Sequence, residues 1–287
     1  MGDLMFKIAG VVVLYYPDNN IKDNILSYLD DIDKLYVVDN TPNINNKKLL
    51  PNSKKIEYIS NKENLGIATA LNIGAKRAID NKYHFLLTMD SDSKFSKNSL
   101  SKMINWLKDN KEDNIGLISP FHELGINQVK SKNKVDYQTV EMTSGNIINL
   151  DIYQKIGGYK DWLFIDCVDF DYCFTLINNG YKTARLNNVI LDHSLGNIKV
   201  DRFLGKNITH SNHSYIRRYY ITRNSFYMNM MYKKKFPNEC AKIMMEVRRD
   251  IVKIILLEKD KYRKLRNMIR GYIDYKKGIT GLYKYKN

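Results

Sequence analysis

The chain lacks a long hydrophobic run, and no apolar stretch reaches the roughly 20 residues that a membrane-spanning helix needs. Its first residues have neither the basic segment nor the small-residue cleavage site of a signal peptide, and residues 7–15 are typical of a buried strand. We therefore expect a cytoplasmic protein. Only 3 of the 287 residues are cysteines, and their spacing fits neither a disulfide scaffold nor a zinc module.

Proline and flexible linkers are also scarce. The chain has 5 prolines and few Gly/Ser clusters, and we find no internal repeat. A hydrophobic content of 44% and a charged content of 27% are those of a folded protein. This length and composition predict one large core, or a core with a small appendage.

The charge is unevenly distributed. The chain has 46 Lys and Arg residues against 31 Asp and Glu residues, a formal net charge of +15. Residues 199–287 have a net charge of about +16 and the preceding residues one of about −1, so the preceding part is close to neutral. A neutral domain with a basic end suggests an anionic partner, either a membrane or a nucleic acid. No nucleic-acid-binding module is recognisable, so we expect no nucleic acid.

Apolar runs that suit strands alternate with segments of helical spacing through the first half. We expect strands at 7–15, 34–40, 56–59, 83–89 and 115–119, and helices at 21–32, 66–80 and 99–109. This alternation predicts an α/β fold with a largely parallel sheet and helices on both faces. Further on we expect a loop or hairpin at 123–136, strands at 139–150 and 183–191, and helices at 151–156, at 168–178 and from 215 onward.

The most informative stretch joins the expected strand 83–89 to two carboxylates, Asp90 and Asp92. Alternate residues of an extended segment share a face, so both side chains can point the same way. Two hard oxygen donors at the carboxyl end of a parallel strand suit Mg²⁺ or Mn²⁺. An Asp-Ser-Asp turn without a metal is the plain alternative.

Several short motifs follow one another in a specific order. They are Val37-Val38-Asp39-Asn40, Asn64-Leu65-Gly66, Asn72-Ile73-Gly74, Met89-Asp90-Ser91-Asp92-Ser93, Ser144-Gly145, Phe164-Ile165-Asp166-Cys167-Val168-Asp169, Asp192-His193-Ser194-Leu195-Gly196 and Arg218-Tyr219-Tyr220-Ile221-Thr222-Arg223-Asn224. The ordered set resembles glycosyltransferase family 2, and most of all its bacterial rhamnosyltransferase-like branch. The resemblance covers about residues 7–225. It implies a GT-A fold, a nucleotide-sugar donor, Mn²⁺ or Mg²⁺, and inversion at the anomeric carbon.

The resemblance also implies a division of the chain. Residues 1–225 would form the GT-A catalytic domain, with the nucleotide-sugar half at about 1–120 and the acceptor half at about 121–225. Residues 226–287 would be a basic, amphipathic helical extension. The extension could pack on the catalytic domain, pair with another subunit or lie on the inner face of the cell membrane.

The resemblance assigns the donor and metal residues. Asp39 would accept a hydrogen bond from a pyrimidine N–H, and Asn64 and Gly66 would lie under the nucleoside. Asp92 would be a direct metal ligand, and Asp90 a ribose or water-mediated partner. His193, which follows the expected strand 183–191, would complete the metal shell. The alternatives are structural: a strand-end turn at Asp39, a helix cap at Asn64 and a polar strand end at His193.

Asp169 matches the base of the family, which takes a proton from the acceptor hydroxyl, and Asp166 is the second candidate. The wider family has Glu-Asp where this chain has Val168-Asp169, as its rhamnosyltransferase-like branch does. Asp169 and Asp171 would also stabilise the start of a helix, which is a sufficient structural reason for their presence.

Five residues are assigned to the acceptor or the phosphates. Ser144, Gly145 and Trp162 would line the acceptor site together with Asp171. Arg223 is the candidate for binding the diphosphate, because a guanidinium pairs well with phosphate oxygens. A basic, solvated helix face is the alternative explanation for Arg223.

These assignments predict an inverting, metal-dependent glycosyltransferase. The expected donor is dTDP-rhamnose, and the expected acceptor is a lipid-linked glycan of bacterial surface polysaccharide synthesis. A UDP-hexose or UDP-N-acetylhexosamine transferase and a non-catalytic nucleotide-sugar-binding protein remain alternatives. The sequence indicates neither the linkage nor the oligomeric state.

Overall fold

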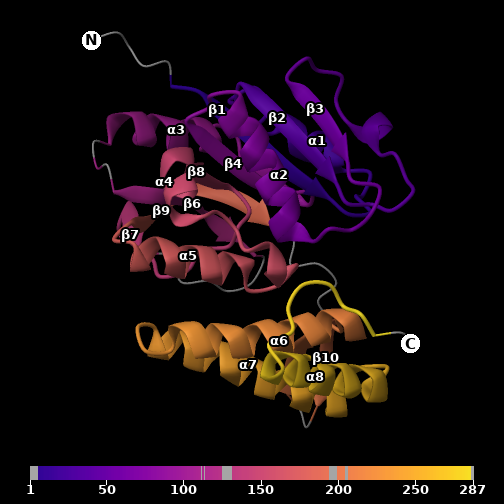
Figure 1. Cartoon of the computed structure of the whole chain (residues 1–287). Helices are drawn as coiled ribbons and strands as arrows, with labels where there is room; N and C mark the ends of the chain where they lie inside the picture. The colour runs from indigo at the N-terminus through magenta and orange to yellow at the C-terminus, as the bar shows by residue number, and fades with distance from the viewer. Residues whose placement is uncertain are drawn as a thin grey trace. The chain divides into compact units, whose positions relative to one another are not determined.

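The structure is a computed structural model of the whole chain, shown in Figure 1. It describes residues 6–110, 112, 114–124, 131–193, 199–203 and 206–285; of residues 193, 199–203 and 206–208 only the backbone is described. The chain divides into two compact units. The first unit comprises Met1–Lys160 and Tyr172–Ser194, and the second comprises Asp161–Asp171 and Leu195–Asn287. Each is described by itself below.

The first unit is built on a nine-stranded sheet with the strand order β3-β2-β1-β4-β8-β6-β9-β5, and β7 pairs with β9 beside this path. The strands are β1 (Ile8–Leu14), β2 (Lys34–Asp39), β3 (Ile56–Ser60), β4 (Phe85–Asp90), β5 (Ser93–Phe95), β6 (Ile115–Glu123), β7 (Val135–Tyr137), β8 (Asn146–Asn149) and β9 (Lys182–His193). Strands β3, β2, β1 and β4 are parallel neighbours, as β6 and β9 are. Strand β8 lies antiparallel between β4 and β6, so the sheet is mixed.

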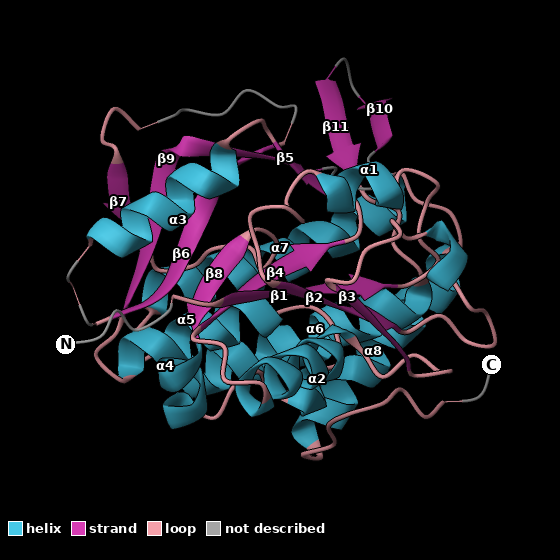
Figure 2. Cartoon of the chain, turned by 90° about the horizontal axis from the view of Figure 1, so that it is seen from above, coloured by secondary structure: helices cyan, strands magenta, loops and turns pink. Residues whose placement is uncertain are grey.

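Helices cover both faces of this sheet, as Figure 2 shows. They are α1 (Ile21–Leu26), α2 (Ile67–Asp80), α3 (Ser99–Asp109), α4 (Leu150–Ile156) and α5 (Val168–Asn178), whose first four residues belong to the second unit. Helix α2 packs directly on β1, because a Cβ added at Gly74 would lie 2.3 Å from Cγ2 of Val11. Alanines fill most of the rest of its buried face, so the helix can approach the sheet closely.

The core of the first unit lies between the sheet and its helices. Strands β1 and β2 are apolar at almost every position, as expected for parallel strands that are buried on both faces. Val12, Leu35 and Val37 are fully buried in it. Burying each such side chain stabilises the fold by about 1.5–3 kcal/mol. The apolar runs that predict β1 and β2 in the sequence are therefore the same residues that stabilise the sheet.

The α/β prediction is confirmed, and most expected elements are present with small shifts in their ends. Three predictions were wrong in extent. Helix α1 ends at Leu26 instead of continuing to residue 32, and the strand expected at 139–150 is limited to Asn146–Asn149. Strand β6 continues through Pro120 to Glu123. The expected loop at 123–136 lies partly outside the described residues and ends in β7.

The second unit is mainly helical. It contains the hairpin of β10 (Lys199–Phe203) and β11 (Lys206–His210), followed by α6 (Tyr215–Tyr232), α7 (Pro237–Leu256) and α8 (Lys261–Lys276). Helix α8 crosses α6 closely, since a Cβ at Gly271 would lie 2.5 Å from the carbonyl oxygen of Tyr219. The helices expected from residue 215 onward are confirmed. The predicted functional division at 225/226 falls within α6 and stays a prediction.

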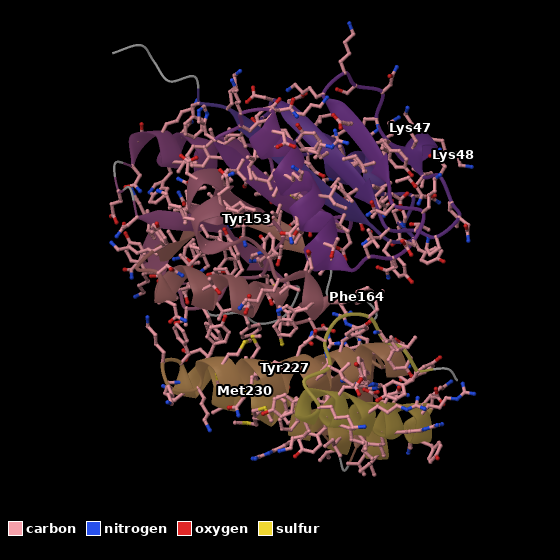
Figure 3. The ribbon with its side chains drawn as sticks, in the orientation of Figure 1. Lys47, Lys48, Tyr153, Phe164, Tyr227 and Met230 are labelled. Carbon is pink, nitrogen blue, oxygen red and sulfur yellow. The ribbon has the colours of Figure 1, made fainter. Side chains whose placement is uncertain are left out.

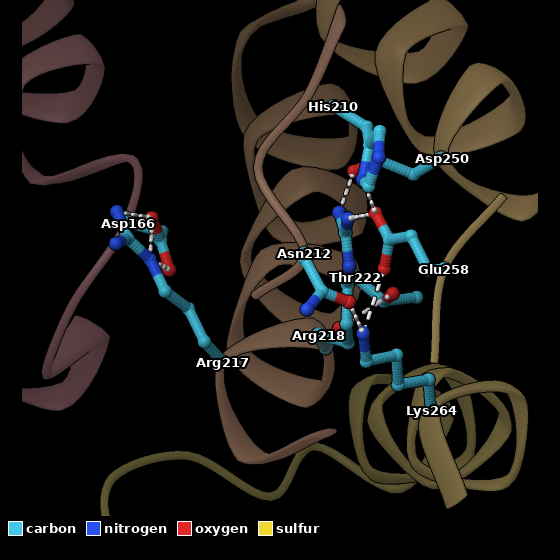
Figure 4. A network of polar contacts seen from close by, with 9 residues as sticks. All are labelled: Asp166, His210, Asn212, Arg217, Arg218, Thr222, Asp250, Glu258 and Lys264. Carbon is cyan, nitrogen blue, oxygen red and sulfur yellow. Dashed lines mark hydrogen bonds and ion pairs between the residues drawn. The ribbon is translucent and has the colours of Figure 1, made fainter. Parts of the chain in front are cut away.

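A buried charge network joins the three helices, as Figure 4 shows. Arg218 pairs with Asp250 and, at 2.6 Å, with Glu258. Lys264 contacts Glu258 at 2.9 Å and the side chain of Asn212 at 2.6 Å. Arg218, Glu258 and Lys264 are almost completely buried. Two cations of the basic region 199–287, Arg218 and Lys264, are therefore buried in the second unit. Such buried charges are tolerated only when they are paired.

Candidate active site

Two predicted site residues lie at the carboxyl edge of the parallel strands. Asp39 ends β2 and Asp90 ends β4, and both strands flank β1. The register pairs Asp39 with Leu14 and Asp90 with Val13. Two strand spacings separate the two residues, which is about 10 Å. Open α/β sheets bind ligands at this edge, so the topology brings both acids to the expected place.

The carboxylate of Asp39 is completely buried and accepts three hydrogen bonds. They come from the backbone N–H of Thr41 at 2.8 Å, the side chain of Asn46 at 2.9 Å and the hydroxyl of Tyr58 at 2.6 Å. Burial, and then the bond to Asp39, raises the pKa of Tyr58, so its phenol stays protonated and donates. The predicted contact with a pyrimidine N–H stays a prediction, and it requires one of these donors to give way. Lys47 and Lys48 follow Asn46 and are exposed (Figure 3).

The predicted nucleoside loop is a tight turn before α2. The side chain of Asn64 accepts a hydrogen bond of 2.9 Å from the N–H of Gly66. Gly66 has a φ of 85° and directly precedes the helix, a conformation that L residues rarely adopt. The side chain of Asn40 donates to the carbonyl oxygen of Gly66 at 3.0 Å. The loop is therefore fixed to the end of β2.

Asp90 ends β4, and Asp92 lies in the turn between β4 and β5. Asp90 is half-buried and Asp92 is exposed. The hydroxyl of Ser144 accepts from the N–H of Asp90 at 3.0 Å and donates to the hydroxyl of Ser93 at 2.8 Å. On the other side, Asn24 donates to the carbonyl oxygen of Ser91 at 2.9 Å. The turn that carries both acids is thus held from two sides.

The same geometry gives Ser144 and Gly145 a structural role. Ser144 is only 1% exposed, and its hydroxyl binds the backbone N–H of Asp90. Gly145 has a φ of 79°, and a Cβ there would lie 2.8 Å from side-chain atoms of Leu191 and Pro120. This burial argues against the predicted contact with an acceptor.

The backbone places the predicted third metal residue beside this turn. Ser93 on β5 pairs with His193 on β9, so His193 lies opposite the residue that follows Asp92. The side chain of His193 is outside the described part of the structure. Among the side chains that are described, no three His, Cys, Asp or Glu residues converge. The accessible carboxylates Asp90 and Asp92 nevertheless have the chemistry that Mg²⁺ and Mn²⁺ prefer.

The predicted base belongs to the second unit. Asp166 lies in the loop before α5 and forms an ion pair of 3.0 Å with Arg217, as Figure 4 shows. Asp169 is in the first turn of α5 and half-buried, and its side chain accepts from the N–H of Phe170 at 2.9 Å. Burial raises the pKa of the neighbouring Cys167, so this thiol stays protonated. The thiol of Cys167 is therefore not the base, and the candidates in this segment are Asp166 and Asp169.

Two other predicted acceptor residues of this segment contact side chains of α6. Asp171 is only 1% exposed and accepts a hydrogen bond of 2.7 Å from the hydroxyl of Tyr232, which argues against the predicted acceptor contact. The ring of Trp162 is half-buried and lies edge-to-face on Tyr227. Its predicted stacking on a sugar stays a prediction.

The predicted phosphate ligand Arg223 is enclosed by the second unit. The side chain is completely buried, and each of its five N–H groups has an acceptor. The acceptors are the carbonyl oxygens of Gly281, Trp162 and Leu163, the hydroxyl of Tyr219 and the side chain of Asn224. No N–H of this described guanidinium is left for a phosphate, so Arg223 is a structural residue of the second unit.

The comparisons with known proteins bear on this arrangement. The family model of "Glycosyl transferase family 2" matches residues 18–170. The chain belongs to glycosyltransferase family 2. It is 27% identical over 298 residues to the dTDP-rhamnosyl transferase RfbF of Shigella flexneri, covering 96% of this chain and 97% of that protein.

Two solved glycosyltransferases share the fold. Staphylococcus aureus TarS 1–349 in complex with UDP-GlcNAc superposes with a TM-score of 0.59 at 12% identity, over 94% of this chain and 81% of TarS. GalNAc-T7 with UDP, GalNAc and Mn²⁺ gives a TM-score of 0.58 at 15% identity, over 87% of this chain and 58% of GalNAc-T7. The predicted GT-A fold with a helical C-terminal part is confirmed, and this member of family 2 is a glycosyltransferase.

Four residues that support this site have no functional assignment from the sequence. Asn40, Asn46 and Tyr58 hold the loops at the end of β2, and Asn224 holds the loop before α5. Asn40 and Asn224 belong to the motifs of the family resemblance, directly after Asp39 and Arg223. Their place in these motifs is the signal that could have identified them as supporting residues.

Among the described helices, none is long and apolar enough to cross a membrane.

Proposed function

We propose that this protein transfers a sugar from a nucleoside-diphosphate donor to a hydroxyl group of a glycan acceptor, with inversion at the anomeric carbon. L-Rhamnose from dTDP-rhamnose is the leading donor. The observation that carries this proposal is the similarity to a dTDP-rhamnosyl transferase over nearly the full length of both chains. The acids at the carboxyl edge of the sheet agree with it, because that edge is where such folds bind nucleotides.

In this proposal Asp169 is the general base. It accepts the proton of the acceptor hydroxyl while the hydroxyl oxygen forms a bond to the anomeric carbon. The bond between that carbon and the phosphate oxygen breaks in the same displacement, and the nucleoside diphosphate leaves with the electron pair. Asp166, paired with Arg217, is the second candidate and lies three residues before Asp169 in the chain. One displacement gives inversion.

Asp90, Asp92 and His193 are proposed to hold Mn²⁺ or Mg²⁺. The two carboxylates on the turn after β4, and the register of β5 with β9, support this set. A bound divalent ion would neutralise negative charge on the departing diphosphate. Asn64 and Gly66 are proposed to lie under the nucleoside, and Asp39 to contact its base. In this proposal the donor is bound by loops of the nucleotide-sugar half, and hydrogen bonds from this chain's own side chains hold these loops.

The first test measures release of nucleoside diphosphate from a panel of dTDP and UDP sugars, with Mn²⁺ or Mg²⁺ and with EDTA. We expect turnover with dTDP-rhamnose that EDTA abolishes. Preference for UDP-N-acetylglucosamine would favour the alternative donor class, to which the fold neighbour TarS with UDP-GlcNAc belongs. Donor binding without any turnover would favour a non-catalytic binding protein.

The second test addresses the named residues. Asp169→Asn should lower transfer at least a hundredfold, since general-base catalysis contributes about 10²–10⁴-fold. Donor binding should remain. Asp151→Asn is the matched control, because Asp151 also lies in the first turn of a helix and is exposed. Near-native turnover of Asp169→Asn would overturn the assignment of the base.

The metal set has its own readout. Mn²⁺ should raise the melting temperature of the wild-type protein, and Asp92→Asn should reduce this shift and lower transfer. An unchanged Mn²⁺ shift in Asp92→Asn would contradict the assignment of Asp92 as a ligand. Because the readout is thermal, it remains informative even for a variant without activity.

We further propose that residues 226–287 contact an anionic lipid surface on the inner face of the cell membrane, where a lipid-linked acceptor would be found. Helices α7 and α8 expose large apolar side chains, among them Val252 and Ile269, on segments rich in lysine and arginine. Met230 on α6 is exposed as well (Figure 3). Such surfaces bind anionic membranes through apolar area and charge together.

Flotation with vesicles tests this proposal on the full chain. The wild-type protein should float with vesicles of phosphatidylglycerol and less with vesicles of phosphatidylcholine. Val252→Glu with Ile269→Glu should reduce flotation, whereas Leu26→Glu, an exposed apolar position of the first unit, should not. Equal flotation of all three proteins would exclude a role for these helix faces.

A further inference from the structure

The loop that leads into α5 has an unusual backbone. Phe164, Asp166 and Cys167 have φ values of 66°, 64° and 64°, in the left-handed region that favours glycine. A non-glycine residue held there is strained and keeps this conformation only where the surroundings enforce it. The strained loop ends one residue before α5, and Asp169 is the second residue of that helix. Whatever holds the loop also orients the proposed base.

One face of α6 follows this loop in the opposite direction. Arg217 pairs with Asp166, and the ring of Tyr220 stacks on that of Phe164 with centroids 4.7 Å apart. Tyr227 lies edge-to-face on Trp162. Residues 217, 220 and 227 recur at helical spacing, so their side chains lie on the same side of α6. Figure 3 labels Phe164 and Tyr227 in this region.

Asn224 is at the centre of this face and is completely buried. Its amide nitrogen donates to the carbonyl oxygens of Leu163, Ile165 and Asp166, at 2.9, 2.7 and 3.0 Å. Its side-chain oxygen accepts from Nε of Arg223 at 3.0 Å, which fixes the orientation of the amide. Three carbonyl oxygens converge on one donor because the left-handed residues turn them inward. Without that donor the oxygens would repel one another.

We propose that Asn224 is a positioning residue of the transfer reaction: it holds the left-handed loop 164–167 and thereby sets the orientation of Asp169 at the start of α5. The proposal rests on the proposed function, because it assumes that Asp169 acts as the base. Asn224 touches neither donor nor acceptor in this scheme. Its loss should therefore change the rate of the chemical step more than the binding of the donor.

The test compares Asn224→Ala with the wild-type protein in steady-state transfer. We expect kcat to fall about 10- to 100-fold, the size that a misplacement of about 1 Å can cause. The KM for the nucleotide sugar should stay within about twofold. Asn229→Ala, on the same helix and half-buried, is the matched control and should keep the wild-type kcat. Melting temperatures of all variants are measured in parallel.

A second substitution separates positioning from general stability. Cys167→Gly supplies a residue that adopts a positive φ without strain. It should recover part of the kcat that Asn224→Ala loses. A residue that served only to stabilise the second unit would alter the melting temperature without this recovery of rate. Asn224→Ser, which retains one donor, is measured beside the alanine variant.

The outcomes separate this proposal from the proposed function. A kcat of Asn224→Ala within twofold of the wild type, with Asp169→Asn inactive, overturns the positioning role and leaves the function in place. Full activity of Asp169→Asn overturns the base itself, whatever Asn224 does. If neither Asn224 variant folds, Asn224 is a folding residue and the positioning role is overturned.

Discussion

Glu141 in the first unit is a buried carboxyl group whose ionisation should weaken the fold. One of its oxygens, Oε2, accepts from Ser119 at 3.2 Å. The other, Oε1, is 3.7 Å from Arg185 and has no hydrogen-bond donor in the described part of the chain. Burial raises the pKa of Glu141 to about 7, and Arg185 and Ser119 only partly oppose this shift. We predict that Glu141→Gln stabilises the protein above neutral pH.

The magnitude follows from proton linkage. The pKa of Glu141 rises from 4.5 to about 7 in the folded protein, and each unit corresponds to 1.36 kcal/mol, which gives about 3 kcal/mol. Between these values the folded protein keeps a proton that the unfolded chain has released. Stability therefore falls as the pH rises from about 4.5 to about 7 and is level above it. Gln mimics the neutral acid, so its advantage is absent at pH 4 and about 3 kcal/mol at pH 8.

The assay is urea unfolding followed by circular dichroism at several values between pH 4 and pH 8. Asp136→Asn is the control of opposite sign. Hydrogen bonds from Asn133, Asn187 and Ser131 lower the pKa of Asp136 to about 2, so its carboxylate stabilises the fold above pH 3.8. This variant should be less stable than the wild type at pH 7. A Glu141→Gln protein that is less stable than the wild type at pH 8 would refute the reasoning.

Three further predictions concern stability. Glu258→Gln removes the buried anion that Arg218 and Lys264 share and should cost about 3–5 kcal/mol by urea unfolding, whereas the exposed Lys259→Gln should change stability little. Gly74→Ala forces a methyl group into Val11 and should lower the melting temperature, at a cost of about 1–3 kcal/mol. Burial and nearby cations lower the pKa of His213 to about 3, so stability should be lost as the pH falls from about 6.5 to 3. His213→Gln should flatten that slope, and an unchanged slope would contradict the assignment.

The sequence predicted the elements whose pattern is local. Strands β1 and β2 are continuous apolar runs, and α3 and α5 have the predicted bounds because their spacing and their terminal residues agree. Asp39 and Asp90 were expected at one edge because parallel strands end on the same side. These conclusions need only the neighbours along the chain and the rules of sheet topology.

The environment of a side chain depends on distant segments, and there the sequence was insufficient. Ser144 is buried because β8 lies beside β4, which brings its hydroxyl to the N–H of Asp90, 54 residues away. Arg223 looks like a phosphate ligand in the sequence, but its acceptors are carbonyl oxygens about 60 positions away in both directions. No periodicity encodes such contacts, since each depends on how two remote segments pack.

In our proposal the pair Arg223-Asn224 is functional without touching a ligand. Carbonyl oxygens of a left-handed loop need donors in a fixed arrangement, and a guanidinium next to an amide on one helix supplies them. A lysine at 223 could not replace the five N–H groups, and an aspartate at 224 would place negative charge against three carbonyl oxygens. The requirement for these residue types thus follows from the loop that they hold, and through it from the orientation of Asp169.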